Sequence, residues 1–163
     1  TGRTRQLPVD EGRGQWALAE VLLRAGELDA ADAAIQAGLA TLRLVAPLDT
    51  PGALATLAAI RLAQGRTAEA LAAAQEGLDA HEAMGACAFF RGGFLRQVHA
   101  ECLDAAGDHE AAKVAITAAR ARVLAIAEKI GDPEYRKSFL ENVPENRLTL
   151  ELARRWVGPD ASS

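Results

Sequence analysis

The sequence is poor in aromatic residues and in cysteine. Aromatic residues make up 4% of a chain that is 50% hydrophobic, so alanine and other small residues must supply much of the core. A core without large side chains needs backbones that approach closely, which favours packed helices over a sheet. The two cysteines are Cys87 and Cys102, and a chain of 163 residues needs no disulfide to fold. We therefore expect buried thiols in a reducing compartment.

The chain also lacks an excess of positive charge and a long apolar run. Its formal net charge is −4, with charges of both signs scattered along it, so it offers no electrostatic footprint for nucleic acid. No uncharged apolar stretch approaches the roughly 18 residues that span a bilayer, and the first residues lack the apolar centre of a signal peptide. These absences predict a cytoplasmic protein without a nucleic-acid or membrane partner.

One short pattern recurs three times. It reads RAGELDAADAAIQAGL from Arg24, AQGRTAEALAAAQEGL from Ala63 and AAGDHEAAKVAITAAR from Ala105. In each copy a glycine is followed five residues later by alanine and twelve residues later by glycine or alanine. These glycines, at 26, 65 and 107, lie 39 and 42 residues apart, which is in the range of two-helix repeats. Because small residues let helices approach closely, the pattern predicts a helical repeat array.

Start and stop signals divide the chain into helices. Antiparallel helix pairs are expected over about 8–47, 50–85 and 87–131, and a C-terminal cap over 132–158. The expected starts carry a proline or a capping residue: Pro8, Thr50–Pro51, Thr67, Asp108, Asp132–Pro133 and Pro144. The sequence thus predicts a single all-α domain over 1–163, a tetratricopeptide-like α-solenoid of about three helix pairs with a capping helix.

Three further expectations concern single segments. Gly92 and Gly93 predict a bend or a close contact inside a helix. The longest helix should bury an apolar stripe made of Val114, Ile116, Val123, Ile126 and Ile130. In the cap, Leu148, Leu152 and Trp156 recur every four residues, so we expect them to shield the last repeat. The first helix has no such cap, which suggests a fragment of a longer polypeptide.

The string SFLENVPENRLTLELARRW, from Ser138 to Trp156, is the most specific part of a resemblance to a known group of proteins. It lies within residues 95–158, which resemble the C-terminal ends of large bacterial signalling proteins. These are eukaryotic-like serine/threonine kinases and ATPases of the AAA and maltose-regulator types. The resemblance implies an α-solenoid that serves as a scaffold or sensor arm, with any kinase or ATPase activity in an upstream region.

The chain contains no phosphate-binding GxxxxGK[ST] string and no HRD or DFG kinase string. We therefore expect no enzymatic activity and no cofactor. His99 and Cys102 lie one helical turn apart, and Cys87 or His81 could add a third metal ligand. A structural zinc site needs four closely spaced ligands, and an apolar helix face explains His99 and Cys102 without any metal, so we expect none.

In tetratricopeptide arrays the first helix of each pair lines the concave surface. By that analogy the inward residues are Arg13, Trp16, Glu20, Leu23, Arg24, Ala55, Ala59, Leu62, Phe94, Gln97, Glu101 and Asp104. The candidates for contact with a protein or peptide partner are Trp16, Glu20, Arg24, Leu62, Phe94, Gln97 and Glu101, because aromatic and charged residues suit a peptide anchor. Alternatively, Trp16 and Phe94 pack against upstream repeats of a longer polypeptide or against neighbouring helices.

The leading hypothesis is thus a non-enzymatic protein-interaction module, the C-terminal regulatory region of a bacterial signalling kinase or ATPase. One alternative is an arm that senses a small effector, which should appear as a deep pocket with convergent polar groups. Another alternative is a self-association domain that forms a homodimer.

Overall fold

The computed structural model describes residues 2–85 and 92–159, and the regular structure within these ranges is helical. The α-helices are α1 (Gly2–Ala25), α2 (Leu28–Val45), α3 (Thr50–Ala63), α4 (Thr67–Ala83), α5 (Gly92–Ala105), α6 (His109–Glu128), α7 (Pro133–Glu141) and α8 (Pro144–Trp156). A short 3₁₀ turn, η1 (Pro47–Asp49), precedes α3. The predicted all-α class is confirmed.

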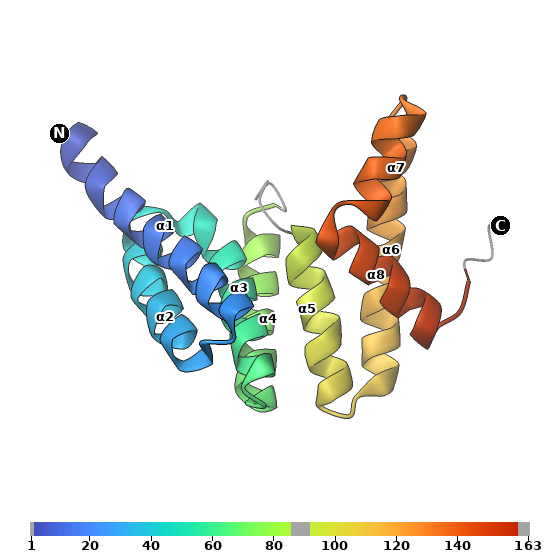
Figure 1. The fold of residues 1–163 in the computed structure, drawn as a ribbon, viewed down its shortest axis with the longest axis horizontal. Helices are drawn as coiled ribbons and strands as arrows, with labels where there is room; N and C mark the ends of the chain where they lie inside the picture. The colour runs from blue at the N-terminus through green and yellow to red at the C-terminus, as the bar shows by residue number, and fades with distance from the viewer. Residues whose placement is uncertain (1, 86–91, 160–163) are drawn as a thin grey trace.

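The helices follow one another across the molecule in chain order, with α1 at one end and α7 at the other (Figure 1). The most extensive contacts join α1 to α2, α3 to α4, and α5 to α6. Contacts of α2 with α3, and of α5 with both α3 and α4, connect these hairpins. The last helix, α8, returns to pack on α6 and α5, and Figure 1 shows it lying across these two helices.

The turn inside each hairpin has the same geometry. Gly26, Gly65 and Gly107 have φ of 80°, 75° and 86°, a conformation in which glycine has no steric cost. In each turn the glycine N–H donates to the carbonyl three residues earlier, and the next N–H donates to the carbonyl five residues before it. This is the hydrogen bonding of a Schellman helix end. The recurring glycines are therefore the helix stops that the sequence predicts.

The recurring small residues lie where helices cross. A Cβ at Gly38 on α2 would be 3.0 Å from the carbonyl oxygen of Gly12 on α1. A Cβ at Gly77 on α4 would be 2.9 Å from Leu95 Cδ1 and 3.3 Å from Leu54 Cβ. The alanines that follow the turn glycines are all fully buried: Ala31, Ala70 and Ala112. Close helix contact thus takes the place of large side chains in this core.

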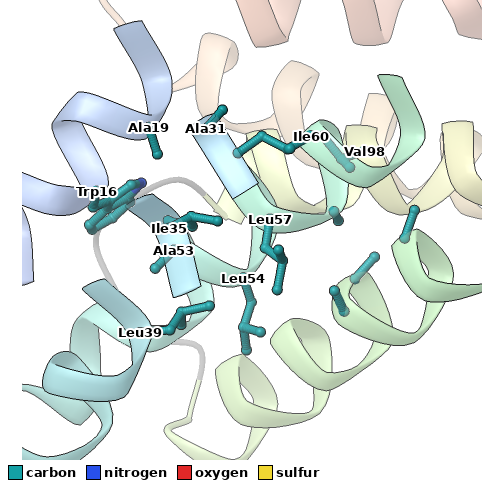
Figure 2. Close-up of a cluster of buried hydrophobic side chains, with 14 of the residues drawn as sticks. Trp16, Ala19, Ala31, Ile35, Leu39, Ala53, Leu54, Leu57, Ile60 and Val98 are labelled. Carbon is teal, nitrogen blue, oxygen red and sulfur yellow. The ribbon is translucent and has the colours of Figure 1, made fainter. Parts of the chain in front are cut away.

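Two clusters of buried apolar residues hold the helices together. The larger cluster contains residues from each of the helices α1 through α5. Figure 2 shows its side chains from α1, α2 and α3 meeting between these three helices. The smaller cluster joins α5, α6 and α8 through Ala100, Ile116, Ala119, Leu152 and Ala153. Leu148 and Trp156 are only partly buried at its margin. Of the expected cap stripe, Leu152 is therefore the core residue.

Several predicted helix ends are wrong. α1 begins at Gly2 and not at the predicted Pro8, which lies inside the helix. A helix can contain a proline at a cost in stability. Thr50 and Thr67 are the first residues of α3 and α4, and neither helix has a side-chain cap. The caps predicted at Asp108 and Asp132 are confirmed, since both carboxylates accept backbone N–H groups. The start predicted near Cys87 lies outside the described residues, and α5 begins at Gly92.

The predicted apolar stripe of α6 is also wrong in part. Val114 and Ile126 are 71% and 51% exposed, whereas Ile116 and Val123 are buried. The buried face consists mainly of small residues: Ala112, Ile116, Ala119, Val123 and Ala127. The positions of large apolar side chains therefore do not identify the buried face of an alanine-rich helix. Where two helices pack most closely, only small side chains fit between them.

None of the helices in the described residues combines the length and the apolar character that a membrane crossing needs.

Candidate functional site

A pocket of about 390 Å³ lies where α1, α3, α5 and α8 meet, and we call it the α1–α8 pocket. Three helices of the row contribute the residues Glu20, Leu23, Arg24, Thr56, Phe94 and Gln97. The first turns of α8 contribute Pro144, Glu145 and Leu148. The pocket therefore combines side chains that are more than 120 residues apart in sequence.

A chain of hydrogen bonds fixes α1 against α3 at this pocket. Trp16 Nε1 donates to Thr56 Oγ1 at 2.9 Å, and Thr56 Oγ1 donates to Glu20 Oε1 at 3.1 Å. Both partners of the first bond are buried, so the bond is protected from water. The result is a Glu20 carboxylate held in place at the wall of the pocket.

The structure places Trp16 in the core rather than at the surface. Its side chain is 8% exposed and belongs to the larger apolar cluster (Figure 2). The expectation that Trp16 is an accessible aromatic anchor is therefore wrong, and the alternative of packing against neighbouring helices describes it. An indole whose N–H has a partner can be buried at little polar cost.

The predicted residues of α5 differ in their positions. Phe94 and Gln97 line the pocket, and Phe94 also packs in part against the larger apolar cluster. Gln97 is buried and donates a hydrogen bond from Nε2 to Glu101 Oε2. Burial raises the pKa of Glu101 above its usual range, Asp104 adds to the rise, and the bond from Gln97 opposes it. Glu101 thus supports Gln97 and does not itself line the pocket.

Four of the predicted contact residues meet in one place, and three do not. Glu20 and Arg24 face Phe94 and Gln97 across the pocket. Leu62 is half-buried against the apolar cluster and is not part of the lining. Trp16 and Glu101 lie behind the lining, where they hold Thr56 and Gln97.

Sequence reasoning missed the contribution of α8. Pro144, Glu145 and Leu148 line the pocket, whereas the sequence predicts that this helix only covers the last repeat. The contact of α8 with α5 brings these residues there. The four-residue spacing of Leu148 and Leu152 indicates an apolar face, but no local signal tells which of two neighbouring helices that face covers.

The lining of the pocket is partly apolar and partly charged. Leu23, Phe94 and Leu148 offer apolar surface, while Glu20, Glu145 and Arg24 carry the charges. Carboxylates outnumber the guanidinium in this lining, so an apolar side chain next to a basic one fits it better than an acidic ligand does. Recognition of a short peptide segment needs this combination of an aromatic contact and fixed polar groups.

The residues considered for a metal do not form a ligand set. In the described part of the chain, no three His, Cys, Asp or Glu side chains lie together in a way that could hold a metal ion. Cys102 is a fully buried free cysteine, and burial together with nearby Glu101 raises the pKa of its thiol to about 12. Burial lowers the pKa of His99 below its usual value, with a small opposing effect from Asp79. Cys87 lies outside the described residues.

Comparisons with protein-family models, curated proteins and solved structures gave no match. Function is therefore inferred from the residues and their geometry. The similarity of residues 95–158 to the ends of bacterial signalling proteins stays a prediction.

Proposed function

We propose that the chain is a non-enzymatic, tetratricopeptide-like module that binds a segment of another protein in the α1–α8 pocket. The repeat interpretation is supported by the three hairpin turns, which share a positive φ at glycine and the same hydrogen bonds. It is also supported by Gly38 and Gly77, which occupy equivalent crossings in successive hairpins. Stacked hairpins of this kind form an α-solenoid, whose inner face is an extended binding surface.

The observation that carries the proposal is the meeting of Glu20, Arg24, Phe94 and Gln97 in one pocket. These residues come from α1 and α5, the first helices of two hairpins, which are the helices expected to line an inner face. Their side chains are acidic, basic, aromatic and amide in character, and specific binding of a ligand needs such a combination of apolar surface and polar groups. The Trp16–Thr56–Glu20 hydrogen bonds hold one wall before any ligand arrives, which lowers the entropic cost of binding.

The ligand chemistry follows from the lining. An apolar side chain of the peptide would lie against Leu23, Phe94 and Leu148, and a neighbouring lysine or arginine would face Glu145. An acidic segment would meet Glu20 and Glu145 without enough positive charge to balance them. We therefore expect a preference for peptides in which apolar and basic residues are adjacent.

Selection from a random peptide display library on the intact chain tests this function. The expected result is enrichment of sequences with adjacent apolar and basic residues. A parallel selection uses the Glu145→Lys variant, whose pocket has the opposite charge at that wall, and the Glu110→Lys variant, which changes an exposed residue on α6 as the matched control. Glu145→Lys should lose the basic preference and Glu110→Lys should keep it. Identical enrichment on all three proteins would contradict the proposed site.

The wider setting is a second part of the proposal. The string from Ser138 to Trp156 supports an origin in the C-terminal regulatory region of a cytoplasmic bacterial signalling kinase or ATPase. In that setting the module brings partner proteins to a catalytic region elsewhere in the polypeptide, and it performs no chemistry itself. An ATP-dependent, saturable rise in the melting temperature of this chain would contradict this assignment.

Self-association is the second candidate, and one observation favours it. Leu18 and Val21 on α1 are 46% and 55% exposed, three residues apart on one side of the helix. Two such faces could pack against each other in a homodimer. Light scattering after size-exclusion chromatography would show a dimer that the double variant Leu18→Ser and Val21→Ser converts to a monomer. A monomeric wild type would exclude this alternative.

A further inference from the structure

A second pocket, of about 490 Å³, lies among α4, α5, α6, α7 and α8, and we call it the cationic pocket. Its lining includes Arg96 of α5, Arg122 of α6 and Lys129, which ends α6. Glu145 is the carboxylate in the lining, and it is also the residue shared with the α1–α8 pocket. Positive charge therefore exceeds negative charge in this pocket, in a chain whose net charge is −4.

The cations of this pocket are not neutralised by ion pairs within the described residues. No carboxylate between residues 2 and 85 or between 92 and 159 lies in ion-pair contact with Arg96, Arg122 or Lys129. Burial, and then the charge of Arg122, lowers the pKa of Arg96, and the charge of Glu82 opposes this effect. An anion close to Arg96 would favour its charged form and offset this effect.

Gly92 and Gly93 of α5 also belong to the lining of this pocket. Gly92 is the first residue of α5 that the structure describes. A Cβ at Gly92 would be 2.9 Å from Arg96 Nη1 and 3.3 Å from the His81 ring, so these two side chains lie directly over Gly92. The guanidinium of Arg96 can form charge-assisted hydrogen bonds with a phosphate group in this pocket.

His81 is an independent sign of a ligand at this place. It belongs to the lining, its side chain is 3% exposed, and its Nδ1 has no hydrogen-bond partner among the described residues. A buried polar group without a partner is costly, and native proteins seldom keep one without a use. Burial, Arg96 and Arg122 lower the pKa of His81, while Glu82 opposes them. The ring is therefore neutral at pH 7 and keeps one N–H as a donor.

The rest of the lining includes the polar Asn146 and Thr149 and a group of four apolar residues, which we call the apolar wall. Val123, Ile126, Phe139 and Val143 face the pocket from α6, α7 and the start of α8. A volume of about 490 Å³ lies within the usual range for small-molecule sites and exceeds what a bare inorganic anion needs. We propose that the cationic pocket binds the phosphate group of a small organic molecule, whose apolar part lies against this wall. This inference does not rest on peptide binding in the α1–α8 pocket.

Titrations of the intact chain with simple probes test the proposal. The probes are inorganic phosphate, phenyl phosphate and sodium chloride at equal ionic strength, with calorimetry and thermal unfolding as readouts. Both phosphates should bind saturably and raise the melting temperature, phenyl phosphate more tightly, and chloride should not. Ile126→Ser changes a half-exposed residue of the apolar wall, so it should remove the advantage of phenyl phosphate without weakening inorganic phosphate.

Charge variants identify the site. Arg122→Gln should raise the dissociation constant for phenyl phosphate at least about tenfold, as expected for loss of a charge-assisted hydrogen bond. The same substitution should also raise the melting temperature of the ligand-free protein, because it removes the repulsion between Arg122 and Arg96. If Arg122 had only a structural role, its replacement would not raise the melting temperature. Arg155→Gln, on the exposed side of α8, is the matched control and should change neither value. Lys129→Gln, with Lys137→Gln as its control, provides a second exposed pair of variants.

Four outcomes would overturn the proposal. They are an equal response to chloride, unchanged binding in both Arg122→Gln and Lys129→Gln, phenyl phosphate that binds no more tightly than inorganic phosphate, and a phosphoserine peptide that binds more tightly than phenyl phosphate. The third outcome would indicate a site for the free anion. The fourth would indicate a site for a phosphorylated protein.

Discussion

Trp16 Nε1 donates a hydrogen bond to Thr56 Oγ1 across the contact between α1 and α3, at 2.9 Å. The two residues are 40 positions apart and belong to different hairpins. Because the threonine hydroxyl also donates to Glu20, one buried side chain joins the packing of the first two hairpins to the geometry of the α1–α8 pocket. The stability of the core and the shape of the candidate site are thus linked through Thr56.

The first prediction concerns this link. Thr56→Val keeps the shape of the side chain but leaves the indole N–H of Trp16 without an acceptor, so it should cost about 1–3 kcal/mol of unfolding free energy. Adding Trp16→Phe removes the unsatisfied donor. The double variant should therefore be about 1 kcal/mol more stable than the sum of the two single effects predicts. Urea denaturation measures the unfolding free energy of all three variants. Strictly additive effects would show that the hydrogen bond between Trp16 and Thr56 does not contribute to stability.

The second prediction separates two glycines inside helices. Gly38→Ala would place a Cβ 3.0 Å from the Gly12 carbonyl oxygen, a backbone atom that cannot move alone, so a loss of about 1–3 kcal/mol is expected. Gly14→Ala meets nothing within 4 Å, so the better helix propensity of alanine should raise stability by about 0.5–1 kcal/mol. Thermal unfolding distinguishes the two signs. A stabilising Gly38→Ala would refute the close crossing of α1 and α2.

The third prediction concerns the contact of α8 with α5 and α6. Leu152 is buried in the smaller apolar cluster, so Leu152→Ala should cost about 2–5 kcal/mol. Trp156 is only partly buried at the margin of the same cluster, so Trp156→Ala should cost less than Leu152→Ala does. Chemical denaturation of both variants checks the order. The reverse order would mean that Trp156, and not Leu152, is the centre of this contact.

The fourth prediction concerns pH. Burial is the main cause that lowers the pKa of both His81 and His99 in the folded chain. The unfolded chain, with histidine pKa values of about 6.5, then binds more protons, so stability should fall as the pH drops below about 6.5 and through the folded pKa values. The raised pKa of Glu101 has the opposite effect on stability. Protonation of this carboxyl group favours the folded chain, and that stabilisation is lost as the pH rises above about 4.5.

Urea unfolding at pH 7.0 and pH 5.5 measures this loss. The decrease should be smaller in His81→Gln and in His99→Gln than in the wild type, because each variant lacks one histidine whose pKa is lowered in the folded chain. An equal decrease in all three proteins would show that these histidines do not set the acid sensitivity.

The features that the sequence predicts well are local. Gly26, Gly65 and Gly107 stop helices because only glycine adopts their φ without strain, and that requirement leaves a direct mark in the sequence. Asp108 and Asp132 cap helices for an equally local reason, since the side chain binds N–H groups two or three residues ahead. Four predicted contact residues meet because α1 and α5 occupy similar positions in their hairpins.

The features that the sequence does not predict depend on distant partners. Trp16 looks like a surface anchor until the position of Thr56 is known. Val114 and Ile126 look like core residues, although the close packing of α6 selects alanine for the buried face. Glu145 enters the lining of both pockets because α8 packs on two helices, and its own neighbours in sequence do not indicate this.

The central claim is that a peptide binds in the α1–α8 pocket, and a titration with two variants tests it most directly. A peptide selected on the wild type is titrated into Phe94→Ala and into Glu110→Ala, after circular dichroism shows that both are folded. Phe94→Ala should lose about 1–2 kcal/mol of binding free energy, roughly tenfold in affinity, because an aromatic contact is removed. Glu110→Ala should bind like the wild type. Equal affinity for Phe94→Ala and the wild type would contradict the assignment of this pocket.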